Sequence, residues 1–290
     1  MKIICFDVGG TNISKAVAQI NPDNKSFEFL EFETIKNPVA TEEVTQLFLQ
    51  YCQKQKKKHN SDKVAVSTAR PVDEEKSRIY SAENYYGREF FDFEFLKSEG
   101  FQVQVENDGK SFALGEYHFG QGREASSLLT LVIGTGIGGG YVGVNGKVLE
   151  GEKGFATEVG HQKMFFENEW QDWESICSGG GIEKRYYKKT GSQFRAQEIF
   201  KRAKEDEDAS AVVSEGREIL GVGIANLLTI FDPAKVVIGG GMSYHREFIK
   251  EAFAMSQKNL FFGNYLDYDW DFTELNRKSN LLGVSWKYFE

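Results

Sequence analysis

Cysteine and histidine are scarce in this chain of 290 residues, and their positions exclude several kinds of site. The three cysteines lie far apart and form no CxxC pair, so the sequence predicts neither a disulfide framework nor a thiolate metal site. The four histidines show no metal-ligand spacing, and we therefore expect no zinc site. A reducing, cytoplasmic location follows from this cysteine usage as an expectation.

Long apolar runs are also missing. No stretch approaches the roughly 18 residues that a membrane span needs, and the first residues are too few and too strand-like for a signal peptide. The formal net charge of −8 argues against nucleic acid as a partner. With 40% apolar and 14% aromatic residues, the chain is expected to fold as one large domain or two ordinary ones, without a membrane partner.

Two familiar nucleotide-binding signatures are absent as well. The chain has no Gly-x-x-x-x-Gly-Lys-Ser/Thr loop. No Gly-x-Gly-x-x-Gly opens a helix after the first strand, and the glycines at 136–140 lead into the apolar segment 141–144, which predicts another strand. These absences disfavour the P-loop and dinucleotide-binding folds.

Two glycine-rich turns are the most informative features that the chain does contain. Asp7-Val8-Gly9-Gly10-Thr11-Asn12 follows the apolar run at 3–6, and Gly134-Thr135-Gly136-Ile137-Gly138-Gly139-Gly140 follows the run at 128–133. Each run predicts a buried strand that leads into a tight turn. Glycine lets the backbone approach a ligand and direct N–H groups at it, which suits phosphate. Two such turns predict a nucleotide held between duplicated halves.

Buried strands and helices alternate along the chain, which predicts an α/β protein. Strands are expected at residues 2–7, 14–20, 27–34, 64–66, 103–105, 128–133, 140–144, 147–149 and 236–238, with Asn145-Gly146 as a hairpin turn. Helices are expected after Thr41 and at residues 111–117, 173–189, 196–205, 209–230 and 247–258. Residues 259–290 show no clear period. The expected lobes are residues 1–110 and 111–275, with a return of residues 276–290 to the first lobe left open.

Five motifs in a fixed order resemble those of ROK-family sugar kinases. They are the two glycine turns, Glu106-Asn107-Asp108, Glu158-Val159-Gly160-His161 and Gly239-Gly240-Gly241-Met242. The resemblance spans roughly residues 3–255. It implies an actin-like ATPase or sugar-kinase fold, with two lobes around a central cleft that closes over a hexose and ATP.

The resemblance also implies a role for each site residue. Asp108 would be the catalytic base, although by itself it also fits a helix cap with Asn107. The sugar-binding residues would be Asn84, Asn107, Glu158, His161 and Glu174. The phosphate-binding residues would be Asp7, Gly9, Gly10, Thr11, Asn12, Thr135 and Gly136, with Gly239 and Gly240 at the adenosine site. Asp7 would also act near Mg²⁺. For Gly239 and Gly240, a strand-to-helix turn without a ligand explains the glycines almost as well.

The chain departs from the family pattern in two places. Most members carry a Cys/His zinc loop where this chain has only residues 162–173, none of them cysteine. Aromatic packing is our hypothesis for what replaces the metal, and the candidates are Phe165, Phe166, Trp170 and Trp173. In the loop at 67–73, Arg70 replaces a residue that is small in the family pattern. One expectation is that Arg70 contacts a sugar substituent or the ATP phosphates, and the other is that it forms a salt bridge with Asp73 or Glu74.

The leading prediction is therefore ATP- and Mg²⁺-dependent phosphorylation of a hexose, with glucose at its 6-hydroxyl as the first choice, by a homodimer or a monomer. Kinases for N-acetylglucosamine, N-acetylmannosamine, fructose or mannose share the same motifs and stay open as alternatives. The phosphate donor, whether ATP, another nucleotide or polyphosphate, is not decided by the motifs. A sugar-binding regulator without catalysis is disfavoured, because such a protein has no use for a catalytic base.

Overall fold

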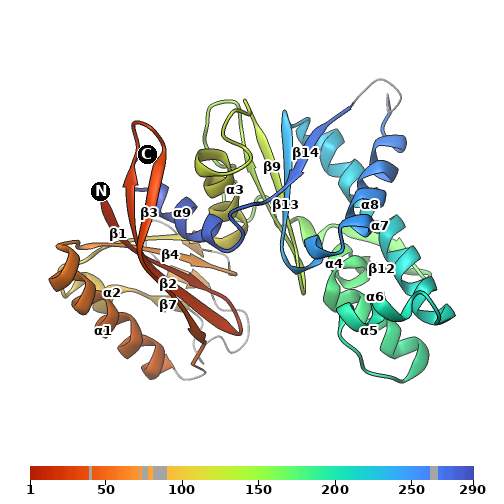
Figure 1. Cartoon of the computed structure of the whole chain (residues 1–290), viewed down its shortest axis with the longest axis horizontal. Coiled ribbons are helices and arrows are strands. Elements are labelled where there is room, and N and C mark those ends of the chain that lie inside the picture. Colours follow the sequence, from red (N-terminus) through yellow and green to blue (C-terminus); the bar gives the residue numbers. More distant parts are fainter. Residues whose placement is uncertain (39–40, 71, 74–77, 81–89, 262–266) are drawn as a thin grey trace. The chain divides into compact units, whose positions relative to one another are not determined.

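The computed structural model describes residues 1–290 apart from residues 39–40, 71, 74–77, 81–89 and 262–266 (Figure 1). The chain divides into two compact units, and each is described by itself below. Unit 1 comprises Met1–Glu124, Lys147–Ala156 and Glu274–Glu290, and unit 2 comprises Ala125–Gly146 and Thr157–Thr273. The boundary suggested by the sequence, at residue 110, falls inside a helix of unit 1.

Unit 1 is built on a five-stranded sheet in the order β3-β2-β1-β4-β8. The strands are β1 (Lys2–Val8), β2 (Asn12–Asn21), β3 (Ser26–Lys36), β4 (Lys63–Thr68) and β8 (Gln102–Asn107). Strands β1, β4 and β8 are parallel, whereas β2 pairs antiparallel with both β1 and β3. Because the carboxyl ends of parallel strands meet at one edge, the residues that end β1 and β8 lie along the same side of the sheet.

Helices cover both faces of this sheet. Phe6 points to the face covered by α1 (Thr41–His59), and its neighbour Cys5 points to the face covered by α9 (Lys278–Trp286). Successive side chains of a strand alternate between faces, so a strand buried on both sides shows an unbroken apolar run. Unit 1 also contains α3 (Asp108–Phe119), α2 (Glu94–Lys97) and a small sheet of β5 (Val72–Asp73), β6 (Arg78–Tyr80) and β7 (Phe90–Asp92).

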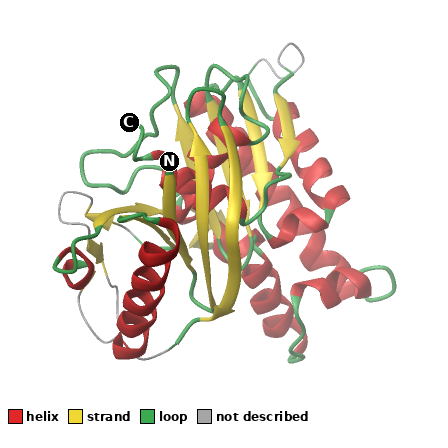
Figure 2. Cartoon of the chain, turned by 60° about the vertical axis from the view of Figure 1, so that its left-hand side comes forward, coloured by secondary structure: helices red, strands yellow, loops and turns green. Residues whose placement is uncertain are grey.

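Unit 2 repeats the plan of the first sheet with four strands, in the order β10-β9-β13-β14. The strands are β9 (Leu128–Ile133), β10 (Ile137–Val142), β13 (Lys235–Gly239) and β14 (Asp269–Phe272). Strands β9 and β10 form an antiparallel hairpin, and β9, β13 and β14 are parallel. Figure 2 shows the strands in yellow and the helices in red.

The remaining elements of unit 2 are helical, apart from one hairpin. The helices are α4 (Trp173–Cys177), α5 (Gly179–Thr190), α6 (Ala196–Arg202), α7 (Glu207–Phe231) and α8 (Arg246–Lys258), with short 3₁₀ helices η1 (Val159–His161) and η2 (Gly241–Tyr244). The hairpin consists of β11 (Lys163–Phe166) and β12 (Glu169–Asp172).

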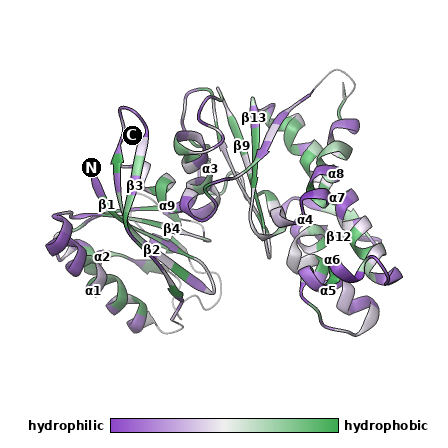
Figure 3. Cartoon of the chain, viewed as in Figure 1, coloured by the Kyte–Doolittle hydropathy of each residue, from purple (hydrophilic) through white to green (hydrophobic). Residues whose placement is uncertain are grey.

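The core of unit 2 lies between its sheet and these helices. Apolar residues are concentrated along β9 and β13, which are largely green in Figure 3. Trp173 is fully buried in this core, and its indole Nε1 donates a hydrogen bond of 2.9 Å to the Ile219 carbonyl oxygen. Gly223 makes room for the indole, because a Cβ atom there would lie 2.1 Å from the ring. None of the helices in the described part of the chain is both long and apolar enough to cross a bilayer.

The strand expected at residues 147–149, with its Asn145-Gly146 hairpin, was wrong. Only Val148 forms an isolated bridge, and this segment belongs to unit 1. The ammonium group of the buried Lys110 donates to the carbonyl oxygens of Glu150 and Gly154, at 3.2 and 2.9 Å. Burying a charged amine requires such partners, and they hold the segment as a loop.

Two other expectations also need correction. The helix expected at 173–189 is interrupted at Ser178, whose backbone is extended and whose Oγ accepts a hydrogen bond of 3.0 Å from the Gly181 N–H, so that a second helix begins there. The segment 259–290, which showed no period, contains strand β14 and helix α9. Both are too short for a periodicity to stand out against the aromatic residues around them.

Candidate active site

The first glycine turn joins β1 to β2 in unit 1. The Gly9 N–H donates to the Asn12 carbonyl oxygen at 3.0 Å, and the Asn37 side-chain amide donates to the Gly9 carbonyl oxygen at 2.7 Å. Within the described part of the chain, no hydrogen bond engages the N–H groups of the exposed Gly10 and Thr11. A Cβ atom at Gly10 would meet nothing within 4 Å. The turn therefore presents two accessible N–H donors, as a phosphate site requires.

Asp7 lies one residue before the end of β1, beside this turn. Burial raises the pKa of its carboxyl group to about 6, against the opposing effects of polar neighbours that include Asn280 and the charge of Arg277. Asp7 lines a cavity of about 230 Å³, together with Gly9, Thr11, Asn12, Ser14 and Arg277. Carboxylate oxygens are the ligands that Mg²⁺ prefers, so Asp7 and the accessible N–H donors fit a cation bound to a phosphate chain.

Asp108 is the first residue of α3, directly after β8. The side chain of Asn107 caps this helix, because its Oδ1 accepts hydrogen bonds from the Gly109 and Lys110 N–H groups at 2.9 and 3.3 Å. Asp108 Oδ1 accepts from the Gly109 N–H at 2.7 Å. The helix-cap interpretation therefore applies to Asn107, and the Asp108 carboxylate stands at the start of the helix.

The two acids share one edge of the unit 1 sheet. In the parallel register Asp7 pairs with Ser67 of β4, and Thr68 pairs with Asn107 of β8. Two strand spacings of about 4.8 Å separate β1 from β8, and Asp108 lies two residues, about 7 Å, beyond the level of Asp7 along the strands, so the backbones of the two acids are roughly 12 Å apart. A separation of this size leaves room for a reacting group between the two carboxyl groups.

Glu106, the first residue of the same motif, has a structural role. Its side chain is 1% exposed, and it forms an ion pair of 2.9 Å with Lys287. A buried carboxylate without its cation would be strongly destabilising. The pair ties β8 to the C-terminal segment of unit 1.

The second glycine turn joins β9 to β10 in unit 2 and is supported by a helix. The carbonyl oxygens of Gly134 and Thr135 accept hydrogen bonds from the N–H groups of Gly179 and Gly180, at 2.8 and 3.1 Å. Within the described residues, no hydrogen bond engages the N–H groups of Thr135 and Gly136. This turn therefore also presents two accessible N–H donors.

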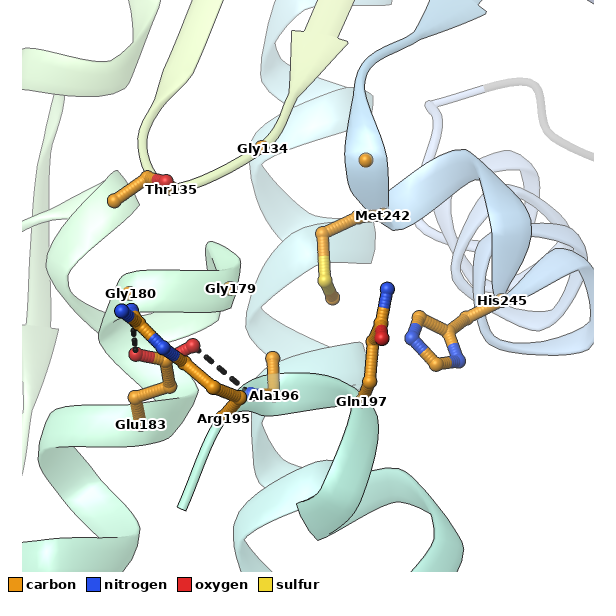
Figure 4. A pocket seen from close by; sticks show the side chains of 11 residues that line it. Gly134, Thr135, Gly179, Gly180, Glu183, Arg195, Ala196, Gln197, Met242 and His245 are labelled. Carbon is orange, nitrogen blue, oxygen red and sulfur yellow. Dashed lines mark hydrogen bonds and ion pairs between the residues drawn. The ribbon is translucent and has the colours of Figure 1, made fainter. Parts of the chain in front are cut away.

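A cavity of about 400 Å³ lies beside this turn, entirely within unit 2 (Figure 4). Its lining residues are Gly134, Thr135, Gly179, Gly180, Glu183, Arg195, Ala196, Gln197, Gly241, Met242 and His245. Glu183 pairs with Arg195 at 3.3 Å and accepts a hydrogen bond of 2.9 Å from the Ala196 N–H. The ring of His245 stacks on Phe200 at 3.9 Å, and burial lowers its pKa. The volume and the mixture of small, aromatic and polar groups fit a nucleoside.

Gly239 and Gly240 lead into this cavity without lining it. Gly239 ends β13, and Gly240 adopts a φ of +87°. A Cβ atom at Gly240 would lie 2.4 Å from the Ile133 carbonyl oxygen, so only glycine fits there. The lining residues are the next two, Gly241 and Met242.

Three of the predicted sugar-binding residues lie on adjacent elements of unit 2. Glu158 precedes η1 and His161 ends it, while Glu174 lies in the first turn of α4, which packs against η1. The His161 ring is 62% exposed, and its Nδ1 lies 3.3 Å from Asp172 Oδ2. Glu174 Oε2 accepts a hydrogen bond of 2.9 Å from the Ile137 N–H. The structure thus brings the elements that carry these three residues together beside β10, which follows the second glycine turn.

The hairpin β11–β12 stands where the zinc loop of relatives was expected. Phe166 and Trp173 pack into the core, as the aromatic hypothesis requires. Phe165 and Trp170 do not, because they are 59% and 70% exposed and contact each other at 5.4 Å. That aromatic packing in this hairpin replaces a metal stays a hypothesis. Lys163 and, to a lesser extent, His161 hold the pKa of Asp172 below its usual range, which anchors the base of the hairpin.

Some predicted residues lie outside the described part of the chain. These are Asn84, expected at the sugar, and Glu74, one of the expected partners of Arg70. Among the described residues, no group of three or more His, Cys, Asp or Glu side chains is arranged to hold a metal ion. That no zinc binds stays a prediction.

Several site residues were missed by the sequence reasoning. Glu183, Arg195, Gln197 and His245 line the nucleoside-sized cavity but belong to no recognised motif. The signal that could have located this region is Ser178 followed by three glycines, a pattern typical of a helix start. Arg277, which lines the cavity at Asp7, had no signal in the sequence.

The chain is similar to known proteins over nearly its whole length. The family model described as ROK family matches residues 3–286. A glucokinase from Streptomyces coelicolor is 27% identical over 97% of this chain and 96% of its own length. An N-acetyl-D-glucosamine kinase from Pasteurella multocida is 33% identical, but over only 50% of this chain and 53% of its own length.

A solved structure shows the same fold. It is a ROK family glucokinase from Streptomyces griseus, in complex with glucose and AMPPNP, and it superposes with a TM-score of 0.79 at 24% identity over 98% of each chain. The fold predicted from the motifs, that of actin-like ATPases and sugar kinases, is therefore confirmed.

Proposed function

The chain belongs to the ROK family, and from this premise we propose that it is a sugar kinase that transfers the γ-phosphoryl group of ATP to a hexose, with glucose and its 6-hydroxyl as the leading acceptor. The observation that carries the proposal is the placement of Asp7 and Asp108 along one edge of the unit 1 sheet. A protein that only binds sugar needs neither a base nor a cation-binding acid there. The match to a glucokinase over nearly the whole chain supports glucose as the acceptor.

In the proposed reaction, Asp108 accepts the proton of the sugar hydroxyl. The hydroxyl oxygen forms a bond to the γ-phosphorus, the bond from that phosphorus to the β–γ bridging oxygen breaks, and ADP leaves. General-base catalysis of this kind contributes about 10²- to 10⁴-fold. The N–H groups of Gly10 and Thr11 in unit 1 donate to phosphate oxygens, as do those of Thr135 and Gly136 in unit 2. Such preorganised donors stabilise the charge that spreads over the transferred group.

The proposed cofactor is Mg²⁺-ATP. When bound, it supplies the electrophilic phosphorus, and the cation neutralises the charge that develops. The cavity of about 400 Å³ in unit 2 is our candidate for the adenosine, with His245 and Met242 against the base. Asp7 is our candidate for holding the cation. The complex of a related glucokinase with AMPPNP supports ATP as the donor.

The sugar is proposed to be held by hydrogen bonds from the residues that the motifs indicate. The proposed set consists of Asn84, Asn107, Glu158, His161 and Glu174. Each hydrogen bond to a charged group contributes about 1.5–3 kcal/mol, so the loss of one hydroxyl from the acceptor is costly.

An N-acetylhexosamine is the second candidate acceptor. It is favoured by the higher identity, 33%, of an N-acetyl-D-glucosamine kinase over half of the chain.

A panel of acceptors distinguishes these candidates. Purified protein is assayed for ADP release with Mg²⁺-ATP and glucose, N-acetylglucosamine, N-acetylmannosamine, fructose or mannose. We expect the largest kcat/KM with glucose. A larger value with an N-acetylated sugar would replace the acceptor and keep the reaction, whereas no sugar-dependent ADP release with any of the five would contradict the proposed function.

A further inference from the structure

The C-terminal helix α9 lies beside the first glycine turn of unit 1. Its place is fixed by direct backbone contact with α3, because a Cβ atom at Gly283 would lie 1.7 Å from the Ser111 carbonyl oxygen. Likewise, a Cβ atom at Gly115 of α3 would lie 2.0 Å from the Ser279 carbonyl oxygen. Such close packing leaves α9 little freedom to shift, so the side chains it directs toward β1 have defined positions.

One of these side chains contacts the acid of the turn. Asn280 Nδ2 donates a hydrogen bond of 3.2 Å to Asp7 Oδ1, across 273 residues of sequence. The bond engages one carboxylate oxygen and so limits rotation of the carboxyl group. It also favours the ionised form of Asp7, in opposition to burial.

Arg277 lies on the segment that leads into α9 and lines the same cavity as Asp7, Gly9 and Thr11. It is the one cation among the described lining residues of this cavity. Within the described part of the chain, its exposed guanidinium makes no hydrogen bond and no ion pair. Arg185 of unit 2, by contrast, pairs with Glu215.

We propose that Arg277 binds the terminal phosphoryl group of the phosphate donor and that Asn280 positions Asp7 beside it. The guanidinium offers a planar set of donors that matches two phosphate oxygens at once. The positive charge of the guanidinium offsets the repulsion between the phosphate chain and the Asp7 carboxylate. The same charge also stabilises the negative charge that develops on the transferred phosphoryl group. The inference rests on the proposed function and adds two residues of the C-terminal segment to its phosphate site.

Substitution of Arg277 tests the first half of the proposal. We expect Arg277→Ala to lower kcat/KM for ATP by about 10- to 100-fold, the equivalent of one charge-assisted hydrogen bond, with KM for the sugar unchanged. Arg277→Lys should recover part of the loss, because lysine keeps the charge without the planar geometry. Lys278→Ala is the matched control, because this exposed neighbour does not line the cavity. The kcat/KM for ATP and the KM for the sugar of this variant should stay within about twofold of the wild-type values. Equal constants for the Arg277→Ala and Lys278→Ala variants would overturn the assignment.

Asn280 is tested by a measurement that a purely structural role would not change. In Asn280→Ala the Asp7 carboxylate loses the hydrogen bond that limits its rotation, so the Mg²⁺ concentration that gives half-maximal kcat should rise by about 3- to 10-fold, the equivalent of one hydrogen bond. KM for the sugar should stay unchanged. A lower kcat at saturating Mg²⁺ with an unchanged Mg²⁺ dependence would refute the positioning role.

A binding experiment separates this inference from the proposed function. Calorimetry with inorganic tripolyphosphate needs neither sugar nor turnover. If the wild type binds tripolyphosphate at least 10-fold more tightly than Arg277→Ala, the phosphate contact is supported even for a protein that fails every acceptor assay. Equal binding by both proteins would contradict the contact, whatever the acceptor assays show.

Discussion

The two glycine turns occupy the same position in two sheets of the same strand order, yet only one of them carries an acid. The hairpin register closes the first turn at Val8 with Ile13 and the second at Ile133 with Ile137. Asp7, one residue before Val8, therefore corresponds to Val132. The same local geometry presents N–H donors in both units, but a carboxylate for a cation in unit 1 alone.

The elements behind the two turns also differ. The carbonyl groups of the second turn are occupied by the start of α5, and the neighbouring cavity of about 400 Å³ is lined by glycine, methionine and histidine as well as by a Glu–Arg pair. The first turn borders a smaller cavity of about 230 Å³ that contains an acid and an arginine. The residues that pack around each turn therefore give the two turns different chemistry. The first turn lies beside the carboxyl group of Asp7 and the guanidinium of Arg277, whereas the second lies beside a larger cavity of nucleoside size.

The largest effect expected from this division is that of Asp108→Asn. It should lower kcat by about 10²- to 10⁴-fold, because the acceptor hydroxyl loses its base. Affinity for AMPPNP should be unchanged, since the nucleoside-sized cavity belongs to unit 2. Steady-state kinetics and calorimetry measure the two quantities. Turnover near the wild-type value would refute the assignment of the base to unit 1.

A smaller effect is expected in unit 2 from Gly241→Val. A Cβ atom at Gly241 meets nothing within 4 Å, so the new side chain fits the folded protein and occupies the cavity instead. We expect AMPPNP affinity to fall by about 10- to 100-fold, consistent with the 1–3 kcal/mol cost of overpacking. Thermal unfolding without nucleotide is the control and should be unchanged. Unaltered affinity would place the nucleoside elsewhere.

The acid that distinguishes the two turns predicts a pH-dependent stability. The folded-state pKa of Asp7, about 6, lies above the ordinary value of 3.8, so the folded protein holds this proton more tightly than the unfolded chain does. This tighter proton binding stabilises the folded protein fully below about pH 4, and the stabilisation is lost as the pH rises through 6. Asp7→Asn should therefore raise the free energy of unfolding at pH 7.5 by on the order of 2 kcal/mol, with little change at pH 4. Urea unfolding without Mg²⁺ at both pH values checks this, and a less stable variant at pH 7.5 would contradict it.

The smallest effect is expected in the hairpin β11–β12 of unit 2. Trp170→Ala should change the free energy of unfolding by less than about 0.5 kcal/mol, because the ring is 70% exposed. Phe166→Ala should cost at least about 1 kcal/mol more, because Phe166 packs against the core and lies under the Arg185 guanidinium at 4.6 Å. Urea unfolding of both variants compares them, and equal losses would show that the exposed ring also supports the fold.

The strands around both turns could be predicted from the sequence, because apolar runs and glycine turns are signals within a few neighbouring residues. The helix expected at 111–117 is also present, but it begins three residues earlier, at Asp108, where Asn107 caps it. The helix break at Ser178 could also have been found from the three glycines after it. The loop at 147–156 could not, because Lys110 holds it from a distant helix. For the same reason, the Asn145-Gly146 pair predicted a hairpin that the structure of residues 140–150 does not contain.

The order of the motifs by itself determined the family and the fold, since both depend on local turn chemistry repeated along the chain. Only the tertiary structure decided which residues line the two cavities, why the pKa of Asp7 is raised, and that Asn280 contacts it across 273 residues. These properties depend on burial and on contacts between segments far apart in the sequence, and no local pattern of residues encodes either.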